Sequence, residues 1–221
     1  MPTTVIIGAG ISGLQCAAAF LRLGHSVTVL EKSDDVGGAW LRYTAFTIRV
    51  PFEFFQLPDF PCPPELQSPD ECPTGRSLLR YIIAYAHRHN LYRHVIFRAT
   101  VTRLHRLGGA WQCYYDLAPG GGLGAGGGFG GGGGRGGGGE EAPVQHRIAA
   151  DFVVVATGLH NALNVPAIES PYLFRGRVLH VQDVPQDDAE LEAMVSGCRV
   201  AVVGGTKTAV DVALRAARAG G

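Results

Sequence analysis

The feature that most constrains this chain is a set of three glycines, Gly8, Gly10 and Gly13, at the spacing G-x-G-x-x-G. The apolar run over residues 5–7 predicts a buried strand before them, and the apolar positions over residues 14–21 predict a helix after them. Gly8 then permits a tight turn, Gly10 lets a pyrophosphate approach the backbone, and Gly13 lets the helix pack closely on the strand. The pattern predicts a strand–turn–helix unit that binds a dinucleotide at the helix N-terminus.

The sequence after this turn supplies the acid that a dinucleotide site needs. The helix is expected to end at Gly24, and residues 26–30 predict a second strand that leads into Glu31. An acid about twenty residues past the glycines binds ribose hydroxyls, and it favours a ribose without a 2′-phosphate, as in FAD or NAD. The plain alternative is a βαβ unit with no ligand.

Composition limits the classes of function. The chain has 221 residues, enough for one sizeable domain or two small ones, and its formal net charge is zero, so neither a nucleic-acid nor an anionic membrane partner is expected. The five cysteines include no C-x-x-C pair, which favours a reducing compartment, here the cytoplasm, and predicts no metal site. No apolar run reaches the ~20 residues that span a bilayer, so no integral membrane segment is expected. The oligomeric state stays open.

A long loop and a helix follow the second strand. Residues 42–73 are rich in proline and phenylalanine without a sustained period, which predicts an ordered loop whose aromatic side chains pack on the core. A helix is expected to start at Thr74, because apolar residues then recur on one helical face. These residues are Leu78, Leu79, Ile82, Ile83 and Ala86.

An antiparallel meander with a glycine-rich insertion is expected next. Its predicted strands cover residues 94–100, 102–107, 111–117 and 144–148. Half of the 32 glycines lie between positions 120 and 139. Residues 119–140 are therefore interpreted as a disordered insertion at a hairpin tip, since a chain this rich in glycine forms no structure of its own.

A further strand and a helix follow the meander. Residues 150–156 predict a buried strand that opens into Thr157 and Gly158. Ligands of open α/β sheets bind at the carboxyl edge of the strands, where these two residues are expected. Residues 187–196 predict a short surface helix.

The opening pattern then returns. Residues 199–203 predict a strand, residues 204–209 (GGTKTA) a turn and residues 210–219 a helix, so that a second dinucleotide site is expected. Lys207 would place a cation near the phosphates, and a solvated lysine is the plain alternative. The apolar face of the predicted helix consists of Val210, Ala213, Leu214 and Ala217.

Six motifs in this order resemble the flavin-containing monooxygenases and their Baeyer–Villiger relatives. They are GAGISG, the strand that leads into Glu31, VGGAW, VVVATG, FRGRVLH and VVGGTKTAVD. The resemblance covers the chain apart from the glycine tract and corresponds to about the first half of a typical member. It implies an α/β architecture: a Rossmann-like FAD-binding domain over residues 1–160, with parallel strands, helices and the antiparallel meander, followed by a linker and the start of a Rossmann-like NADPH-binding domain over residues 161–221.

The resemblance also implies roles for individual residues. For FAD, the residues are Gly8, Gly10, Ser12 and Gly13 at the pyrophosphate, Glu31 at the ribose, Gly38 and Trp40 of the Gly-Gly-x-Trp motif, Val101 at the adenine, and Thr157 and Gly158 of the Ala-Thr-Gly motif. For NADPH, they are Gly204, Gly205, Thr206, Lys207 and Thr208. The family fingerprint corresponds to Phe174, Gly176 and His180, where His180 either couples the domains or simply hydrogen-bonds a loop. No residue is assigned as a general acid or base.

The activity implied by the resemblance is that of a monooxygenase that uses FAD, NADPH and O2 to oxidise a small substrate at a nucleophilic nitrogen or sulfur atom. Val184 stands where either subgroup of the family carries an aromatic residue, so the oxidised atom stays open. Two alternatives are kept: an NADPH oxidase or flavin reductase without oxygen transfer, and a truncated chain that at most binds FAD. The second is considered because the chain ends within the second nucleotide motif.

Overall fold

A computed structural model describes residues 1–67, 72–124, 144–159, 165–166 and 173–220. The chain forms two compact units, and each is described by itself. The first comprises Met1–Leu41 and Tyr81–Leu159, and the second comprises Arg42–Arg80 and His160–Gly221.

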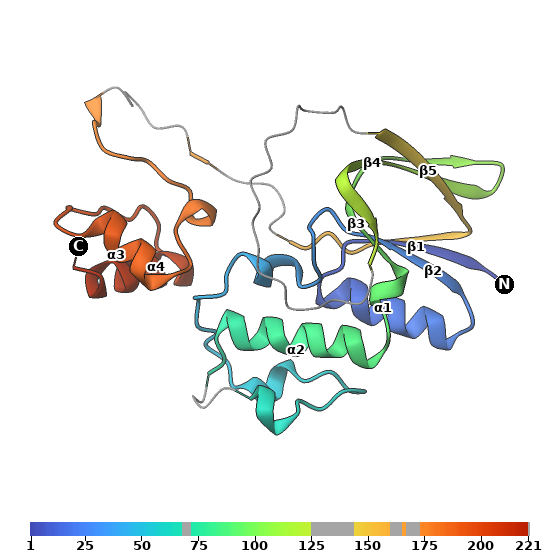
Figure 1. The fold of residues 1–221 in the computed structure, drawn as a ribbon, viewed down its shortest axis with the longest axis horizontal. Helices are drawn as coiled ribbons and strands as arrows, with labels where there is room; N and C mark the ends of the chain where they lie inside the picture. The colour runs from blue at the N-terminus through green and yellow to red at the C-terminus, as the bar shows by residue number, and fades with distance from the viewer. Residues whose placement is uncertain (68–71, 125–143, 160–164, 167–172, 221) are drawn as a thin grey trace. The chain divides into compact units, whose positions relative to one another are not determined.

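The elements of the first unit are β1 (Thr3–Ile7), α1 (Ile11–Arg22), β2 (Ser26–Leu30), the 3₁₀ turns η1 (Gly38–Leu41) and η4 (Tyr92–His94), β3 (Val95–Leu107), β4 (Ala110–Leu123), β5 (Val144–Ala150) and β6 (Phe152–Val155) (Figure 1). Those of the second unit are η2 (Phe52–Phe55), η3 (Pro64–Leu66), η6 (Val181–Asp183), α3 (Asp188–Val195) and α4 (Lys207–Arg218). Helix α2 (Gly75–Arg88) crosses from the second unit into the first.

The first unit is built on one six-stranded sheet of order β5-β4-β3-β2-β1-β6. Strands β6, β1, β2 and the start of β3 run parallel, whereas β3, β4 and β5 form an antiparallel meander. Helix α1 connects β1 to β2 and contacts β1, β2 and β6 (Figure 1). The predicted Rossmann-like α/β fold with its antiparallel insertion is confirmed.

The core of the first unit follows the predicted apolar pattern in β1 and α1, but the strand predicted to be buried over residues 150–156 was wrong in its burial, since β6 lies at the edge of the sheet with Phe152 50% and Val155 63% exposed. Residues 4–7 of β1 are buried, because this strand lies in the parallel part of the sheet between β2 and β6. From α1 the sheet receives Leu14, Ala17 and Ala18, which are almost fully buried. Helix α2 buries Tyr81, Ile82 and Tyr85. It begins at Gly75, where the Thr74 hydroxyl accepts a hydrogen bond from the Ser77 N–H at 3.1 Å, as expected of a cap.

Two predictions in the meander were wrong. Residues 95–107 form one strand rather than two, because irregularities at 97–99 and 101–103 shift the register without ending the pairing with β4. The proposed disordered insertion also began too early. Residues 119–123 belong to β4, in which Gly122 pairs with Phe97 and the Arg98 side chain donates to the Pro119 carbonyl at 2.9 Å. Cross-strand pairing holds these glycines extended; residues 125–140 of the insertion lie outside the described ranges.

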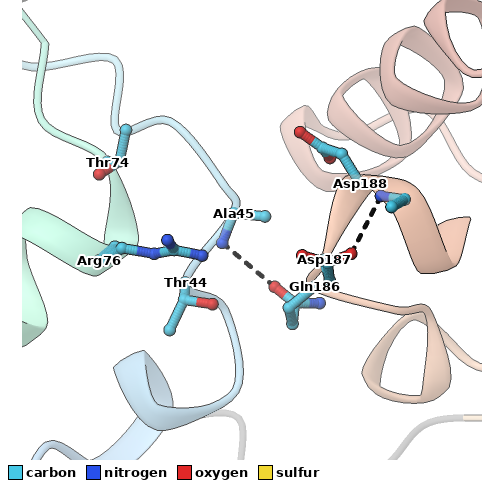
Figure 2. A pocket seen from close by; sticks show the side chains of 8 residues that line it. Thr44, Ala45, Thr74, Arg76, Gln186, Asp187 and Asp188 are labelled. Atoms are coloured by element: carbon cyan, nitrogen blue, oxygen red, sulfur yellow. Dashed lines mark hydrogen bonds between the residues drawn. The ribbon is translucent and has the colours of Figure 1, made fainter.

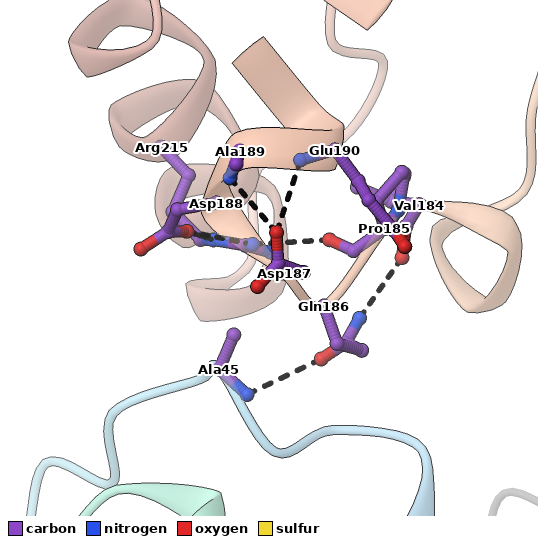
Figure 3. Close-up of polar contacts among 9 residues, drawn as sticks. All are labelled: Ala45, Val184, Pro185, Gln186, Asp187, Asp188, Ala189, Glu190 and Arg215. Atoms are coloured by element: carbon purple, nitrogen blue, oxygen red, sulfur yellow. Dashed lines mark hydrogen bonds and ion pairs between the residues drawn. The ribbon is translucent and has the colours of Figure 1, made fainter. Parts of the chain in front are cut away.

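In the second unit, polar contacts fix α3. The Asp187 carboxylate accepts hydrogen bonds from the Ala189 and Glu190 N–H groups at 3.0 and 3.1 Å and so caps the helix predicted over residues 187–196. Arg215 of α4 binds the Asp188 carboxylate at 2.9 Å and the Pro185 carbonyl at 3.0 Å (Figure 3). The Arg215 contacts link α4 to the start of α3.

The strand predicted over residues 199–203 was wrong, since this segment is irregular and Val203 is 91% exposed. A strand needs a hydrogen-bonding partner, and every strand in the described ranges belongs to the first unit. The following helix α4 does form, but it starts at Lys207 instead of residue 210. Its predicted apolar face is partly exposed at Val210 and Leu214, whereas Asp211 is buried.

None of the helices within the described ranges is long and apolar enough to cross a membrane.

Asp151 joins the starts of β1 and β6. Its carboxylate accepts hydrogen bonds from the Thr3 N–H at 2.7 Å and the Thr3 hydroxyl at 2.8 Å. In return its own N–H donates to the Thr3 carbonyl at 3.1 Å. The two hydrogen bonds from Thr3 lower the pKa of the Asp151 carboxyl below its ordinary value.

We expect this contact to stabilise the fold at neutral pH and to fail in acid. Because the pKa of Asp151 is lower in the folded state, its contribution is fully present above the unfolded pKa and is lost as the pH falls through the folded value. Thermal unfolding of the wild type and D151N between pH 7 and pH 3 would test this. The difference in melting temperature should shrink toward acid pH, and a difference that stays constant with pH would contradict the assignment.

Candidate functional site

Turns converge at the carboxyl ends of the parallel strands β1, β2 and β6. The Gly8 N–H, just past β1, donates to the Leu30 carbonyl of β2 at 2.8 Å. The Ala156 N–H, just past β6, donates to the Ile7 carbonyl of β1 at 2.9 Å. These bonds bring the glycine-rich turn beside Glu31 and the Ala-Thr-Gly segment, at the edge where α/β sheets bind ligands.

Two glycines of the turn are required by close packing. Gly8 has φ +104°, and a Cβ there would lie 2.5 Å from the Ala156 carbonyl oxygen. A Cβ on Gly13 would collide with the Gly8 carbonyl oxygen. Gly10 differs from both, since it has φ −73° and a Cβ there would meet only the Gly38 Cα, at 3.7 Å. The backbone and neighbours of Gly10 therefore tolerate an alanine in the protein without a ligand.

Glu31 is fixed by hydrogen bonds through both its backbone and its carboxylate. The side chain is 4% exposed, its Oε2 accepts from the Ala9 N–H at 2.6 Å, and its Oε1 accepts from the Ser33 N–H at 2.8 Å. Its backbone N–H donates to the Ile96 carbonyl, and its carbonyl accepts from the Ala99 N–H. A carboxylate oxygen can accept more than one hydrogen bond, so Glu31 keeps capacity for ribose hydroxyls.

The Gly-Gly-x-Trp segment lies against the same turn. The Gly37 N–H donates to the Ala9 carbonyl at 3.0 Å. Gly38 has φ +59°, and a Cβ there would lie 3.0 Å from the Gly10 Cα. Trp40 follows in η1 and is half-buried. Gly38 is thus brought to Gly10 by backbone approach, which only a glycine permits at this distance.

The N-terminus of α1 is suited to an anion. Gly10 is the N-cap residue, so no N-cap side chain accepts a hydrogen bond from the first turn of α1, and this turn contains no acidic residue. The free N–H groups and the helix dipole therefore give a positive potential there. Ser12 is exposed in this first turn.

The remaining FAD residues expected from the resemblance lie on neighbouring segments of the first unit. Val101 is half-buried in β3, where it pairs with Tyr115. Thr157 and Gly158 are exposed just past β6, and Gly158 has φ +83°. The roles of these three residues at a cofactor stay predictions.

The fingerprint residues lie in the second unit. A Cβ on Gly176 would lie 2.6 Å from the Phe174 ring, so these two residues are in contact. His180 is half-buried, and its Nδ1 accepts a hydrogen bond from the Gln182 N–H at 3.3 Å. The Gln182 side chain in turn accepts from Arg42 at 2.9 Å. The bond between His180 and Gln182 is a hydrogen bond within a loop, as one of the two interpretations of His180 predicts. The other interpretation, that His180 couples the two domains, stays a prediction.

The second glycine turn differs from the first in its surroundings. Gly204, Gly205 and Thr206 are exposed, and Thr206 precedes α4 without a capping bond from its side chain. Thr208 follows within the first turn of α4. Lys207 forms an ion pair with Asp211, whose side chain is 7% exposed. The Lys207 ammonium is thus engaged by a buried carboxylate rather than fully solvated.

A pocket is formed within the second unit. It is lined by Thr44, Ala45, Thr74, Arg76 and residues 186–189 (Figure 2). The Ala45 N–H donates to the Gln186 side chain at 3.3 Å. No residue predicted for a cofactor lines this pocket. Within the described ranges, no three His, Cys, Asp or Glu side chains are grouped as a metal site requires.

Sequence reasoning missed Asp35 and Tyr92. The Tyr92 hydroxyl donates to the Asp35 carboxylate at 2.8 Å, beside the Gly37–Gly38 turn. An aspartate just before two glycines is a turn signal that could have drawn attention to Asp35. Tyr92 carries no such signal, because it is 57 positions away and reaches the loop only through the fold.

Comparisons with known proteins agree with this geometry. A family model described as an NAD(P)-binding Rossmann-like domain matches residues 6–61. Probable flavin-containing monooxygenase 1 of Arabidopsis thaliana is 34% identical over 97% of this chain. The chain is a homologue of the flavin-containing monooxygenases. It spans 41% of the length of that Arabidopsis relative.

Solved structures of related proteins show the same fold. S-allyl-L-cysteine S-oxygenase from Allium sativum matches with a TM-score of 0.72 at 20% identity, over 98% of this chain and 49% of its own. The OTEMO complex with FAD and NADP matches with a TM-score of 0.71 at 24% identity, over 98% of this chain and 37% of its own. At these sequence identities the structural similarity supports only the fold of the present chain.

We predict unequal effects on stability at two glycines of the turn. G13A should lower the free energy of unfolding by about 2–3 kcal/mol, because its Cβ meets a backbone oxygen that cannot move aside. G10A should change it by less than about 1 kcal/mol, since Gly10 has an ordinary φ and open space. Chemical denaturation of both variants measures this. Equal losses would show that the glycines are not distinguished by packing.

Proposed function

We propose that the first unit binds FAD and that the protein is an FAD- and NADPH-dependent monooxygenase. It would insert one atom of O2 into a small substrate with a nucleophilic nitrogen or sulfur atom. The observation that carries the proposal is the junction of Glu31 with Ala9, which places an acid beside a glycine turn and an uncapped helix N-terminus. The homology to flavin-containing monooxygenases supports the same conclusion.

The proposed binding mode uses backbone more than side chains. The pyrophosphate would lie over Gly10 at the start of α1, with the Ser12 hydroxyl as a further donor. Glu31 would accept hydrogen bonds from the adenosine ribose. Gly38 would support the glycine turn at the cofactor, because its backbone packs closely on Gly10. Trp40, Val101, Thr157 and Gly158 are the remaining proposed contacts.

In the proposed reaction the cofactor would supply the chemistry and the protein would bind and orient it. Bound flavin would supply hydride acceptance from NADPH and the reaction with O2. The residues of this chain would bind and orient the cofactor, and none is proposed to exchange a proton with the substrate. In this proposal residues 1–160 form the FAD-binding domain, and the cytoplasm is the compartment that the cysteine pattern favours.

NADPH is proposed to bind through residues 161–221, the linker and start of a second domain. Its phosphates would lie near Gly204, Gly205, Thr206, Lys207 and Thr208. Lys207 would then bind a phosphate while it keeps its contact with Asp211, since an ammonium group can donate three hydrogen bonds. His180, with Phe174 and Gly176, is proposed to couple cofactor binding to the arrangement of the domains.

A second candidate is FAD binding without oxygen transfer, as in an NADPH oxidase or flavin reductase, or in a chain that only binds FAD. It is favoured by the absence of any strand beside the Gly204–Gly205 turn in the described part of the second unit. Peroxide released in equal amount to NADPH consumed, whatever amine or sulfide is offered, would indicate an oxidase. Oxygenated product formed in step with NADPH consumption would indicate the monooxygenase.

We predict that the purified chain binds FAD and that G10A weakens this binding by about tenfold or more, a loss of about 1.4 kcal/mol or more. The reason is that its Cβ would stand where the pyrophosphate approaches. Flavin fluorescence titration gives the dissociation constant. G122A is the matched control, because Gly122 lies in β4 outside the proposed site, its φ is not in the left-handed region, and nothing lies within 4 Å of an added Cβ. Wild-type affinity in G10A, or no FAD binding by the wild type, would contradict the proposal.

A further inference from the structure

Asp35 and Tyr92 form a part-buried contact beside the Gly37–Gly38 turn. One oxygen of the Asp35 carboxylate accepts two hydrogen bonds, from the Tyr92 hydroxyl at 2.8 Å and from the Val36 N–H at 2.7 Å. Tyr92 is 5% exposed and lies in η4, which connects α2 to β3. Both residues belong to the first compact unit. The contact therefore ties the loop after β2 to a distant part of the same unit.

The segment that follows Asp35 forms one wall of the glycine turn. Val36 is fully buried and so anchors the loop beside Asp35. The Gly37 N–H then binds the Ala9 carbonyl, and Gly38 lies close to Gly10. The hydrogen bond that Val36 donates couples its backbone to the Asp35 carboxylate. A displacement of Asp35 would therefore move the residues that face the proposed pyrophosphate position.

Tyr92 is held rigidly enough to act as the fixed end of this contact. Its ring stacks on His87, with centroids 4.7 Å apart, and lies 6.0 Å from the Phe97 ring. Burial, and then the hydrogen bond to Asp35, raise the pKa of the Tyr92 hydroxyl above its ordinary value. The hydroxyl therefore remains a proton donor to Asp35 throughout the neutral range.

We propose that Tyr92 is a positioning residue of the dinucleotide site, which acts through Asp35 to hold the Gly37–Gly38 turn against Gly10. This inference rests on the proposed function and adds a residue that does not touch the cofactor. Its physical basis is preorganisation. If only a fraction of the protein molecules holds this loop in the binding conformation, the apparent dissociation constant for FAD equals the intrinsic one divided by that fraction.

The experiment measures FAD dissociation constants by flavin fluorescence in four variants of the whole chain. Y92F removes only the donor and should bind FAD about three to ten times more weakly than the wild type. D35A, which removes the acceptor for both bonds, should lose at least as much. D35N keeps an oxygen that can accept both bonds and should stay within about twofold of the wild type. Y114F is the matched control, a half-buried tyrosine of β4 outside the core cluster, and should bind like the wild type.

A double variant separates positioning from general stabilisation. If Tyr92 acts through Asp35, D35A/Y92F should bind FAD no more weakly than D35A alone, whereas independent effects would multiply. Hydrogen exchange of the FAD-free Y92F protein should be faster at residues 36–38 than in the wild type, with exchange in β1 unchanged. A purely structural role would instead raise exchange throughout the unit.

The outcomes distinguish this inference from the function on which it rests. If the wild type binds FAD and Y92F binds it equally well, the positioning role is wrong and the proposed function stands. Multiplicative losses in D35A/Y92F would also overturn the role. If the wild type binds no FAD, the proposed function is wrong and the inference falls with it. Should Y92F fold poorly, D35A and D35N test the Asp35 end of the contact, and equal FAD affinity in these two variants would overturn the role.

Discussion

The hydrogen bond from the Ala9 N–H to the buried Glu31 carboxylate is the contact on which the candidate site depends. It joins the turn after β1 to the end of β2, and the backbone of Glu31 extends the link to β3 through Ile96 and Ala99. A buried carboxylate without partners would be costly, so the two N–H groups that it accepts from are required by its burial. The same group that orders the loops is the one proposed to bind the adenosine ribose.

Missing side chains shape the site as much as this carboxylate. Gly8 lies against the Ala156 carbonyl, Gly13 against Gly8, and Gly38 against Gly10, and each approach leaves no room for a Cβ. The resulting surface consists of backbone and the start of α1. Such a surface suits the binding of an anion, and the proposed function assigns none of its residues as a general acid or base.

Local pattern predicted this part of the chain well. Contacts within a few positions determine strands β1 and β2, the glycine turn after β1 and the end of α1 before Gly24. The residue types of these segments agree with the fold. Long-range pairing decided what the sequence did not predict. Gly122 is extended because Phe97 pairs with it, and residues 199–203 stay irregular because no described strand lies beside them. The Tyr92–Asp35 contact was missed for the same reason.

Binding of FAD and of FMN to the purified chain can be compared. The proposed site recognises the pyrophosphate and the adenosine ribose, both of which FMN lacks, whereas the two molecules share the flavin ring. Equilibrium titration of the purified chain with each flavin, followed by fluorescence, should show binding of FAD and at least tenfold weaker binding of FMN. Equal affinity for both flavins, or no affinity for FAD, would contradict the account of the glycine turn and Glu31 given above.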